Sequence, residues 1–222
     1  MKEEEQRVIL ENKIKSLILP KTELVFVHIP KNAGTTISRV MFQRSNGIGG
    51  HLTASMINSV EEYKNHKNFL FCRDPFNRFV SVYLWRLRKD ELIQRLTIED
   101  VIERLSNSEI KQPTKFGFES DENKLDRMFL AQTDWMNHNT VYVGRTENTN
   151  KHMLKLKKQY KLDFPLQDVH HNPAKTFGPQ PKPTRALLIK ILNDSTSLRN
   201  TFFDYYGKDY EEFGYNIPKE LK

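Results

Sequence analysis

LVFVHIPKNAGTT, residues 24–36, joins an apolar strand, a short turn and the start of a helix in one segment. Residues 24–29 are rich in β-branched and aromatic side chains, which is typical of a strand covered on both faces. Pro30 ends this run, residues 31–34 form a loop of mainly small side chains, and Thr35 and Thr36 open a helix. Such a loop directs backbone N–H groups at one point, and the helix dipole adds positive potential there. The segment therefore predicts a phosphate or sulfate site.

The loop differs from the nucleotide-binding P-loop. The pattern GxxxxGK[ST] is absent from it, because Lys31 precedes Gly34 instead of following it. Taken alone, the segment is also compatible with a tight turn between strand and helix that carries an exposed lysine. A second segment is needed to choose between these interpretations.

That second segment is FCRDPFNRFVSVY, residues 71–83. Residues 69–72 predict another buried strand, Arg73 follows its carboxyl end, and Pro75 suits the first position of a helix that runs towards Arg88. Ligands of open α/β sheets bind at the carboxyl ends of strands. An arginine fork at Arg73 and a hydroxyl at Ser81 suit a terminal phosphate. The alternative is that Arg73 pairs with a carboxylate and Ser81 packs between helices.

Strands alternate with helices along the chain. We expect a third strand at residues 140–143 and helices at 3–19, 53–63, 75–88, 97–105, 125–135, 148–160 and 186–206, the last as one broken helix or two. This order predicts an α/β fold, a P-loop NTPase-like parallel sheet flanked by helices. We expect a single domain over residues 1–222, with an N-terminal helix at 1–20 and a proline-rich, lid-like segment at 163–184.

Composition limits the classes of partner. The net charge of +7 would attract a polyanion such as a nucleotide, an acidic glycan, nucleic acid or a membrane surface. Cys72 is the only cysteine, so no intrachain disulfide forms, and its apolar neighbours predict a core position. The sequence shows neither a signal-peptide pattern nor an apolar stretch long enough to span a bilayer, and a cytoplasmic protein is expected, with membrane-surface contact possible.

Several segments together resemble one family. PKNAGTT resembles the 5′-phosphosulfate loop of sulfotransferases that use PAPS (3′-phosphoadenosine 5′-phosphosulfate), and RDPFNRFVSVY resembles their 3′-phosphate-binding motif. FLAQTDW at 129–135, VGRTEN at 143–148 and YYGKDYEEFGY at 205–215 are similar to the carbohydrate O-sulfotransferase branch, of the sulfotransferase family 2 type, and its bacterial relatives. The resemblance covers residues 24–215, nearly the whole chain.

The resemblance implies a donor site, with PAPS as donor and PAP as product. Two groups of residues match donor ligands: the loop residues Lys31, Asn32, Ala33, Gly34, Thr35 and Thr36 at the phosphosulfate, and Arg73 and Ser81 at the 3′-phosphate. By position, Lys175 also reaches the 3′-phosphate end, together with Asn172 and Thr176, although Lys175 also fits an ordinary solvated charge.

Sulfuryl transfer needs a base for the acceptor hydroxyl, positive charge at the leaving oxygen and fixed donors for the sulfuryl oxygens. Lys31 suits the leaving oxygen. His51, in the loop GGHLTAS, is our candidate base, because related glycan sulfotransferases have a catalytic histidine in this region. The other candidates are His170 or His171 and then Glu147, whereas His28 is expected to be structural. No metal is expected.

The sequence thus predicts transfer of a sulfuryl group from PAPS to a hydroxyl of a glycan or glycoconjugate. A non-carbohydrate small molecule is the alternative acceptor. A nucleotide kinase would need GK[ST] and a magnesium carboxylate, which we do not find. A non-catalytic, basic polyanion-binding module fits the net charge, but no nucleic-acid-binding motif appears.

Overall fold

The computed structural model describes residues 3–44, 50–165 and 185–221. The chain divides into two compact units, and each is described by itself. The first unit comprises Met1–Arg73, Pro113–Gly117 and Trp135–Gly178, and the second comprises Asp74–Gln112, Phe118–Asp134 and Pro179–Lys222. The assignment of residues 1–222 to one sulfotransferase domain stays a prediction.

A three-stranded parallel sheet forms the centre of the first unit. Its strands are β1 (Leu24–Val27), β2 (Lys67–Cys72) and β3 (Thr140–Arg145), in the order β1-β2-β3. β1 and most of β2 are buried, as expected for apolar runs covered on both faces, and Cys72 is in this core. The α/β prediction is confirmed as a small parallel sheet flanked by helices.

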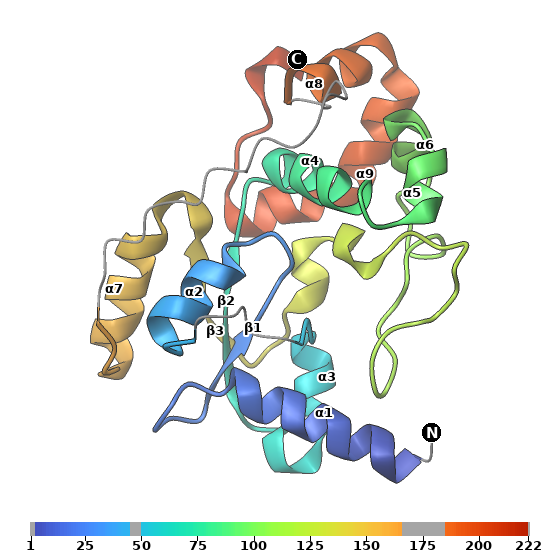
Figure 1. Ribbon diagram of the computed structural model, residues 1–222. Coiled ribbons are helices and arrows are strands. Elements are labelled where there is room, and N and C mark those ends of the chain that lie inside the picture. Colours follow the sequence, from blue (N-terminus) through green and yellow to red (C-terminus); the bar gives the residue numbers. More distant parts are fainter. Residues whose placement is uncertain (1–2, 45–49, 166–184, 222) are drawn as a thin grey trace. The chain divides into compact units, whose positions relative to one another are not determined.

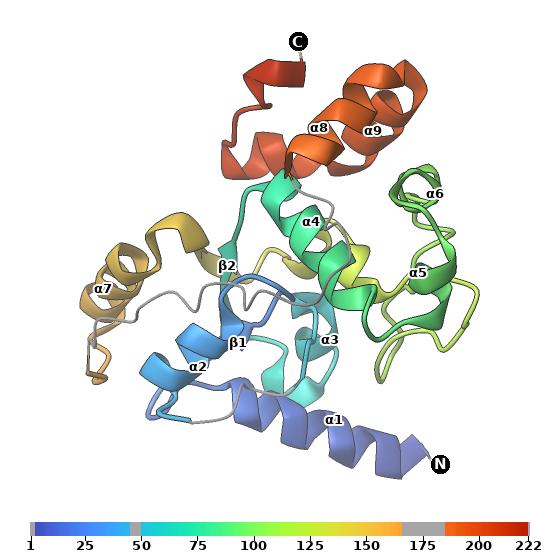
Figure 2. The ribbon, with the colours of Figure 1, turned by 45° about the horizontal axis from the view of Figure 1, so that its top comes forward.

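The helices of the first unit cover both sides of this sheet. They are α1 (Glu3–Leu17), α2 (Gly34–Met41), α3 (Ala54–Asn58) and α7 (Thr149–Tyr160), with 3₁₀ turns η1 (Glu61–Tyr63) and η4 (Thr146–Asn148). α2 and α7 lie on one side of the sheet and α3 lies on the other (Figures 1 and 2). α1 contacts β1, an edge strand of the sheet, and an antiparallel bridge joins Ile18, just after α1, to Val25.

The second unit is helical in its described part. It contains α4 (Pro75–Arg86), α5 (Glu91–Arg95), α6 (Ile98–Glu103), α8 (Arg185–Asp194) and α9 (Thr196–Phe213), and the 3₁₀ turns η2 (Arg127–Phe129) and η5 (Lys219–Leu221). Its core is aromatic: Phe79 of α4 packs edge-on against Phe202 of α9, with 5.4 Å between ring centroids. Aromatic residues of α9 therefore form part of this core.

Several predicted helices differ in extent. Residues 125–135 form two 3₁₀ turns, η2 and η3 (Gln132–Trp135), instead of one helix, because side-chain carboxylates take the N–H groups that a continuous helix would use. The predicted helix at 53–63 divides into α3 and η1. α4 ends at Arg86, and Asp90 caps the short α5, which was not predicted. Residues 186–206 belong to two helices, of which α9 continues to Phe213.

Candidate functional site

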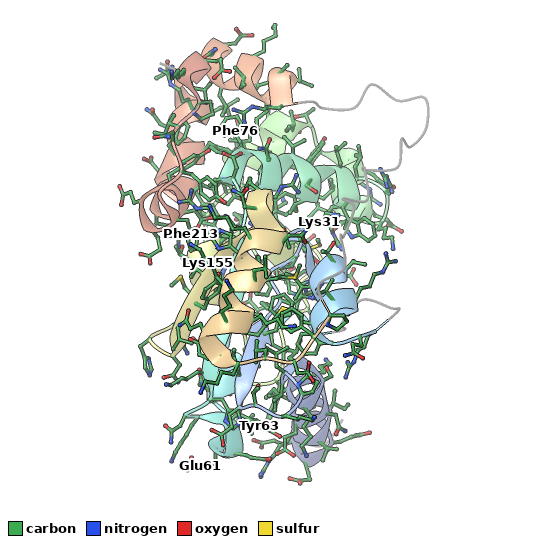
Figure 3. The ribbon with its side chains drawn as sticks, turned by 90° about the vertical axis from the view of Figure 1, so that its left-hand side faces the viewer. Lys31, Glu61, Tyr63, Phe76, Lys155 and Phe213 are labelled. Carbon is green, nitrogen blue, oxygen red and sulfur yellow. The ribbon has the colours of Figure 1, made fainter. Side chains whose placement is uncertain are left out.

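The carboxyl edge of the sheet brings three cationic residues of the first unit to one side. Cys72 pairs with Arg145 across β2 and β3, and Val27 pairs with Leu70 across β1 and β2. The loop after β1, Arg73 after β2 and Arg145 at the end of β3 therefore share this edge. Lys31 lies beside the start of α2, whereas Tyr63 is at the other end of the same unit (Figure 3). This is the edge where open parallel sheets bind ligands.

Left-handed and other backbone conformations alternate along the loop. Lys31 (φ 67°) and Ala33 (φ 58°) are left-handed, and Asn32 between them is not. Alternation of this kind turns successive N–H groups towards a common centre, which forms an anion-binding concavity. A left-handed conformation costs an L-residue about 1–2 kcal/mol. Strain of this kind collects at ligand sites, where the surrounding structure holds it in place.

Asn32 fixes the loop to the sheet. Its side chain is 1% exposed, and Nδ2 donates to the carbonyl oxygen of Phe71 in β2 at 2.7 Å. Asn32 was predicted to bind the donor; its side-chain amide is directed at the protein instead. Any contribution of Asn32 to an anion would therefore come from its backbone N–H.

The start of α2 is suited to an anion. Ala33 is the N-cap and supplies no side-chain acceptor, and the first turn contains no acidic residue. The first N–H groups of a helix have no intrahelical partner, and the dipole is positive there. Gly34, Thr35 and Thr36 form this first turn, so the predicted phosphosulfate residues lie where a bound anion gains both effects.

Arg73 lies against the same loop. Its Nη1 donates to the carbonyl oxygen of Lys31 at 3.3 Å, and its side chain is only half-buried. The structure therefore brings together Lys31 and Arg73, which the sequence had placed in separate motifs. Arg145 ends β3, and its backbone lies next to the end of β2.

His51 is held with one ring nitrogen facing the protein. Nδ1 lies 3.0 Å from the carbonyl oxygen of His28, and because a carbonyl only accepts, Nδ1 carries the proton of the neutral ring. Nε2 is then the basic nitrogen. The ring of His28 is 4.3 Å away between centroids, and Trp135 meets His51 edge-on at 6.5 Å. The contact with the His28 carbonyl thus fixes the neutral tautomer of His51, with Nε2 as its basic nitrogen.

The structure does not test the remaining predicted ligands. Ser81 is half-buried on α4, in the second unit, and its donor contact stays a prediction. Lys175, like His170 and His171, lies outside the described residues. Within the same motif, Arg78 is structural, since it is 1% exposed and donates to the carbonyl oxygens of Leu130 and Met128.

One close contact was not predicted from sequence. The imidazole of His28 occupies the space beside Gly34 in which a side chain would lie. No spacing rule finds this contact, because it depends on how the turn between β1 and α2 folds back. His28 was expected to be structural, and its packing is taken up below.

These features define an α/β protein in which a loop with two left-handed residues and a helix start without a side-chain cap lie at the carboxyl edge of a parallel sheet. A family model described as "Sulfotransferase family" matches residues 15–216, and the chain belongs to this family. No curated protein and no solved structure matches the chain significantly. Within the described ranges, no helix is long and apolar enough to cross a membrane, and no cluster of three His, Cys, Asp or Glu residues has the arrangement of a metal site.

Proposed function

We propose that this protein transfers a sulfuryl group from PAPS to a hydroxyl group of a glycan or glycoconjugate. Family membership supports sulfuryl transfer in general. The observation that carries the finer proposal is the loop of residues 31–36, which combines the left-handed turn, the uncapped start of α2 and two neighbouring cations. A doubly anionic phosphosulfate group fits such a site.

PAPS supplies an activated sulfuryl group, and transfer breaks the bond between sulfur and the oxygen that bridges to the 5′-phosphate. Charge develops on that oxygen in the transition state. In our proposal the Lys31 ammonium stabilises this charge, and the N–H groups of Gly34, Thr35 and Thr36 hold the phosphosulfate oxygens. The Arg73 guanidinium pairs with the donor, and the family resemblance places this contact at the 3′-phosphate.

His51 is proposed to take the proton of the acceptor hydroxyl as its oxygen bonds to sulfur. The hydrogen bond from Nδ1 to the His28 carbonyl leaves Nε2 with its lone pair. A neutral imidazole is the side chain most often used to accept a proton in such a step. The products are the sulfate ester and PAP, and the proton leaves through His51.

The test is transfer of labelled sulfuryl groups from PAPS to a panel of glycans and small-molecule hydroxyl compounds. We expect glycan acceptors to be labelled in the presence of EDTA. His51→Ala should lower turnover at saturating donor by about 10²–10⁴-fold, the usual range for loss of a general base. His138→Ala is the matched control, because His138 is exposed in the same unit.

The outcomes separate the alternatives. Labelling of non-carbohydrate acceptors alone would reassign the substrate, and magnesium-dependent ATP consumption without sulfation would identify a kinase. Binding of polyanions without any transfer would contradict catalysis altogether. If His51→Ala stays within a few-fold of the wild type, the base is another group, and His170, His171 and Glu147 are the next residues to replace.

A further inference from the structure

His28 fills the side-chain space of Gly34. A Cβ atom built on Gly34 would lie 1.7 Å from Nε2 of His28, and the next two nearest atoms also belong to this imidazole. Gly34 does not have a positive φ. Its backbone therefore accepts any L-residue, and the glycine is required only because the imidazole occupies the space.

The same ring touches two further groups of the site. It stacks on Phe26 of β1, with 5.4 Å between centroids and 18° between planes. It also contacts His51, with 4.3 Å between the centroids. His28 is only 9% exposed, so these contacts hold the ring in one place. One imidazole thus lies between the start of α2 and the candidate base.

We propose that His28 is a positioning residue, which fixes the phosphosulfate loop at Gly34 and the ring of His51 at a set separation. It acts through contact: the Nε2 side of the imidazole supports the turn into α2 at Gly34, and the ring packs against His51. In this role the imidazole is a packing group, and the proton transfer is assigned to His51. Its consequence for catalysis rests on the proposed function, whereas its contact with Gly34 does not.

The experiment adds a methyl group at position 34, removes the imidazole at position 28, and combines the two changes in a double variant. Gly34→Ala forces the added methyl group into the imidazole, and we expect the Tm of the ligand-free protein to fall by roughly 5–10 °C. His28→Ala removes the obstacle but leaves a gap. In the double variant the methyl group enters that gap, so its Tm should exceed that of Gly34→Ala alone. A double variant no more stable than Gly34→Ala would overturn the proposal.

Gly144 provides the matched control. A Cβ there would also meet an aromatic ring, with Phe71 Cε1 at 2.6 Å, and its three nearest atoms all belong to Phe71. Gly144→Ala should therefore be destabilising, and His28→Ala should not rescue it. Rescue of both glycine variants would show that His28→Ala acts on the whole unit, and it would contradict a specific contact.

The catalytic consequence has a different readout. PAP affinity, lowered in Gly34→Ala, should recover in the double variant, because the start of α2 regains its position. Turnover at saturating donor should remain at least about tenfold below the wild type, since a methyl group does not replace the ring that supports His51. Full recovery of turnover in the double variant would show that the His28 ring is not needed to support His51. If the wild type itself does not bind PAP, the proposed function fails, while the Tm of the ligand-free double variant still tests the contact.

Discussion

Lys31 and Ala33 hold left-handed backbones in a loop that a glycine would enter more easily. The fold maintains this conformation through Asn32, whose amide is bonded to β2, and through α2, whose N-cap is Ala33. The protein's own contacts therefore hold the turn in this conformation. In the proposed reaction, donors held in this way are effective because they need no reorganisation.

Replacing Lys31 by alanine tests whether its ammonium group stabilises the charge that develops on the leaving oxygen. The substitution keeps a Cβ, so the backbone preference changes little and the ammonium group is the main loss. We expect kcat to fall by roughly a hundredfold or more, comparable to the loss of one preorganised donor. The acceptor KM should change less. Steady-state kinetics at saturating PAPS measures both.

Lys21→Ala is the control, because Lys21 is also a lysine with a left-handed backbone (φ 62°) and lies in the turn before β1. It should keep wild-type kinetics. A Lys31→Ala variant with normal kcat and only a raised donor KM would assign Lys31 to ground-state binding and remove it from the leaving-group role.

At the scale of elements, α7 follows β3 and places His152 against the sheet. The Tyr142 hydroxyl lies 3.1 Å from His152 Nδ1, and Phe71 meets the imidazole edge-on. Burial lowers the pKa of His152, and the charges of Lys155, Arg145 and Lys151 lower it further, while Glu147 opposes them. The folded protein therefore keeps this ring neutral at pH values where the unfolded chain protonates it.

This pKa shift predicts a loss of stability in acid. As pH falls below the ordinary histidine pKa of ~6.5, the unfolded state takes up a proton that the folded state takes up only at lower pH. The free energy of unfolding should fall through that window, and less so in His152→Gln. Urea unfolding at pH 7.5 and 5.5 measures the difference, with the exposed His138→Gln as control. Equal pH dependence in the wild type and His152→Gln would contradict the assignment.

Asp209 organises the second unit from within α9. Its carboxylate accepts hydrogen bonds from the backbone N–H groups of Gln132 and Thr133, at 2.8 and 2.9 Å, and from both of their side chains. Burial raises the pKa of Asp209, and the two backbone N–H donors partly offset this rise. Its carboxylate replaces the backbone acceptors that a continuous helix over residues 125–135 would have used.

Asp209→Asn should destabilise the protein by about 2 kcal/mol, because an amide NH₂ then faces donors that have lost their acceptor. Chemical denaturation measures the change in the free energy of unfolding. Asp204→Asn is the matched control, since Asp204 is exposed on the same helix. An Asp209→Asn variant as stable as Asp204→Asn would show that the carboxylate is not needed at this position.

The main elements could be predicted because their signals are local. Apolar runs locate β1 and β2, Pro75 marks the start of α4, and the Thr97–Asp100 capping box marks α6. The division of residues 125–135 could not be predicted, because Asp209 lies far along the chain. Likewise, the motifs indicated Lys31 and Arg73 separately, whereas the bond between them and the packing of His28 on Gly34 depend on the folded loop.

At the scale of the whole molecule, the net charge of +7 favours an anionic partner without specifying one. The family match over residues 15–216 narrows the reaction to sulfuryl transfer. The loop after β1 and Arg73 after β2 are the observations behind our proposal that the donor is PAPS. The acceptor depends on other surfaces, and a screen of hydroxyl compounds identifies it.

The most direct test is calorimetric titration of the full chain with PAP in the presence of EDTA. We predict saturable binding of one PAP per chain without magnesium. Arg73→Ala should weaken PAP binding by about 2 kcal/mol, the scale of a lost charge-assisted hydrogen bond. Arg39→Ala, which replaces an exposed arginine on α2, should leave PAP binding unchanged. No heat of binding with PAP, together with binding of ATP that requires magnesium, would contradict the assignment of this loop to a sulfuryl donor.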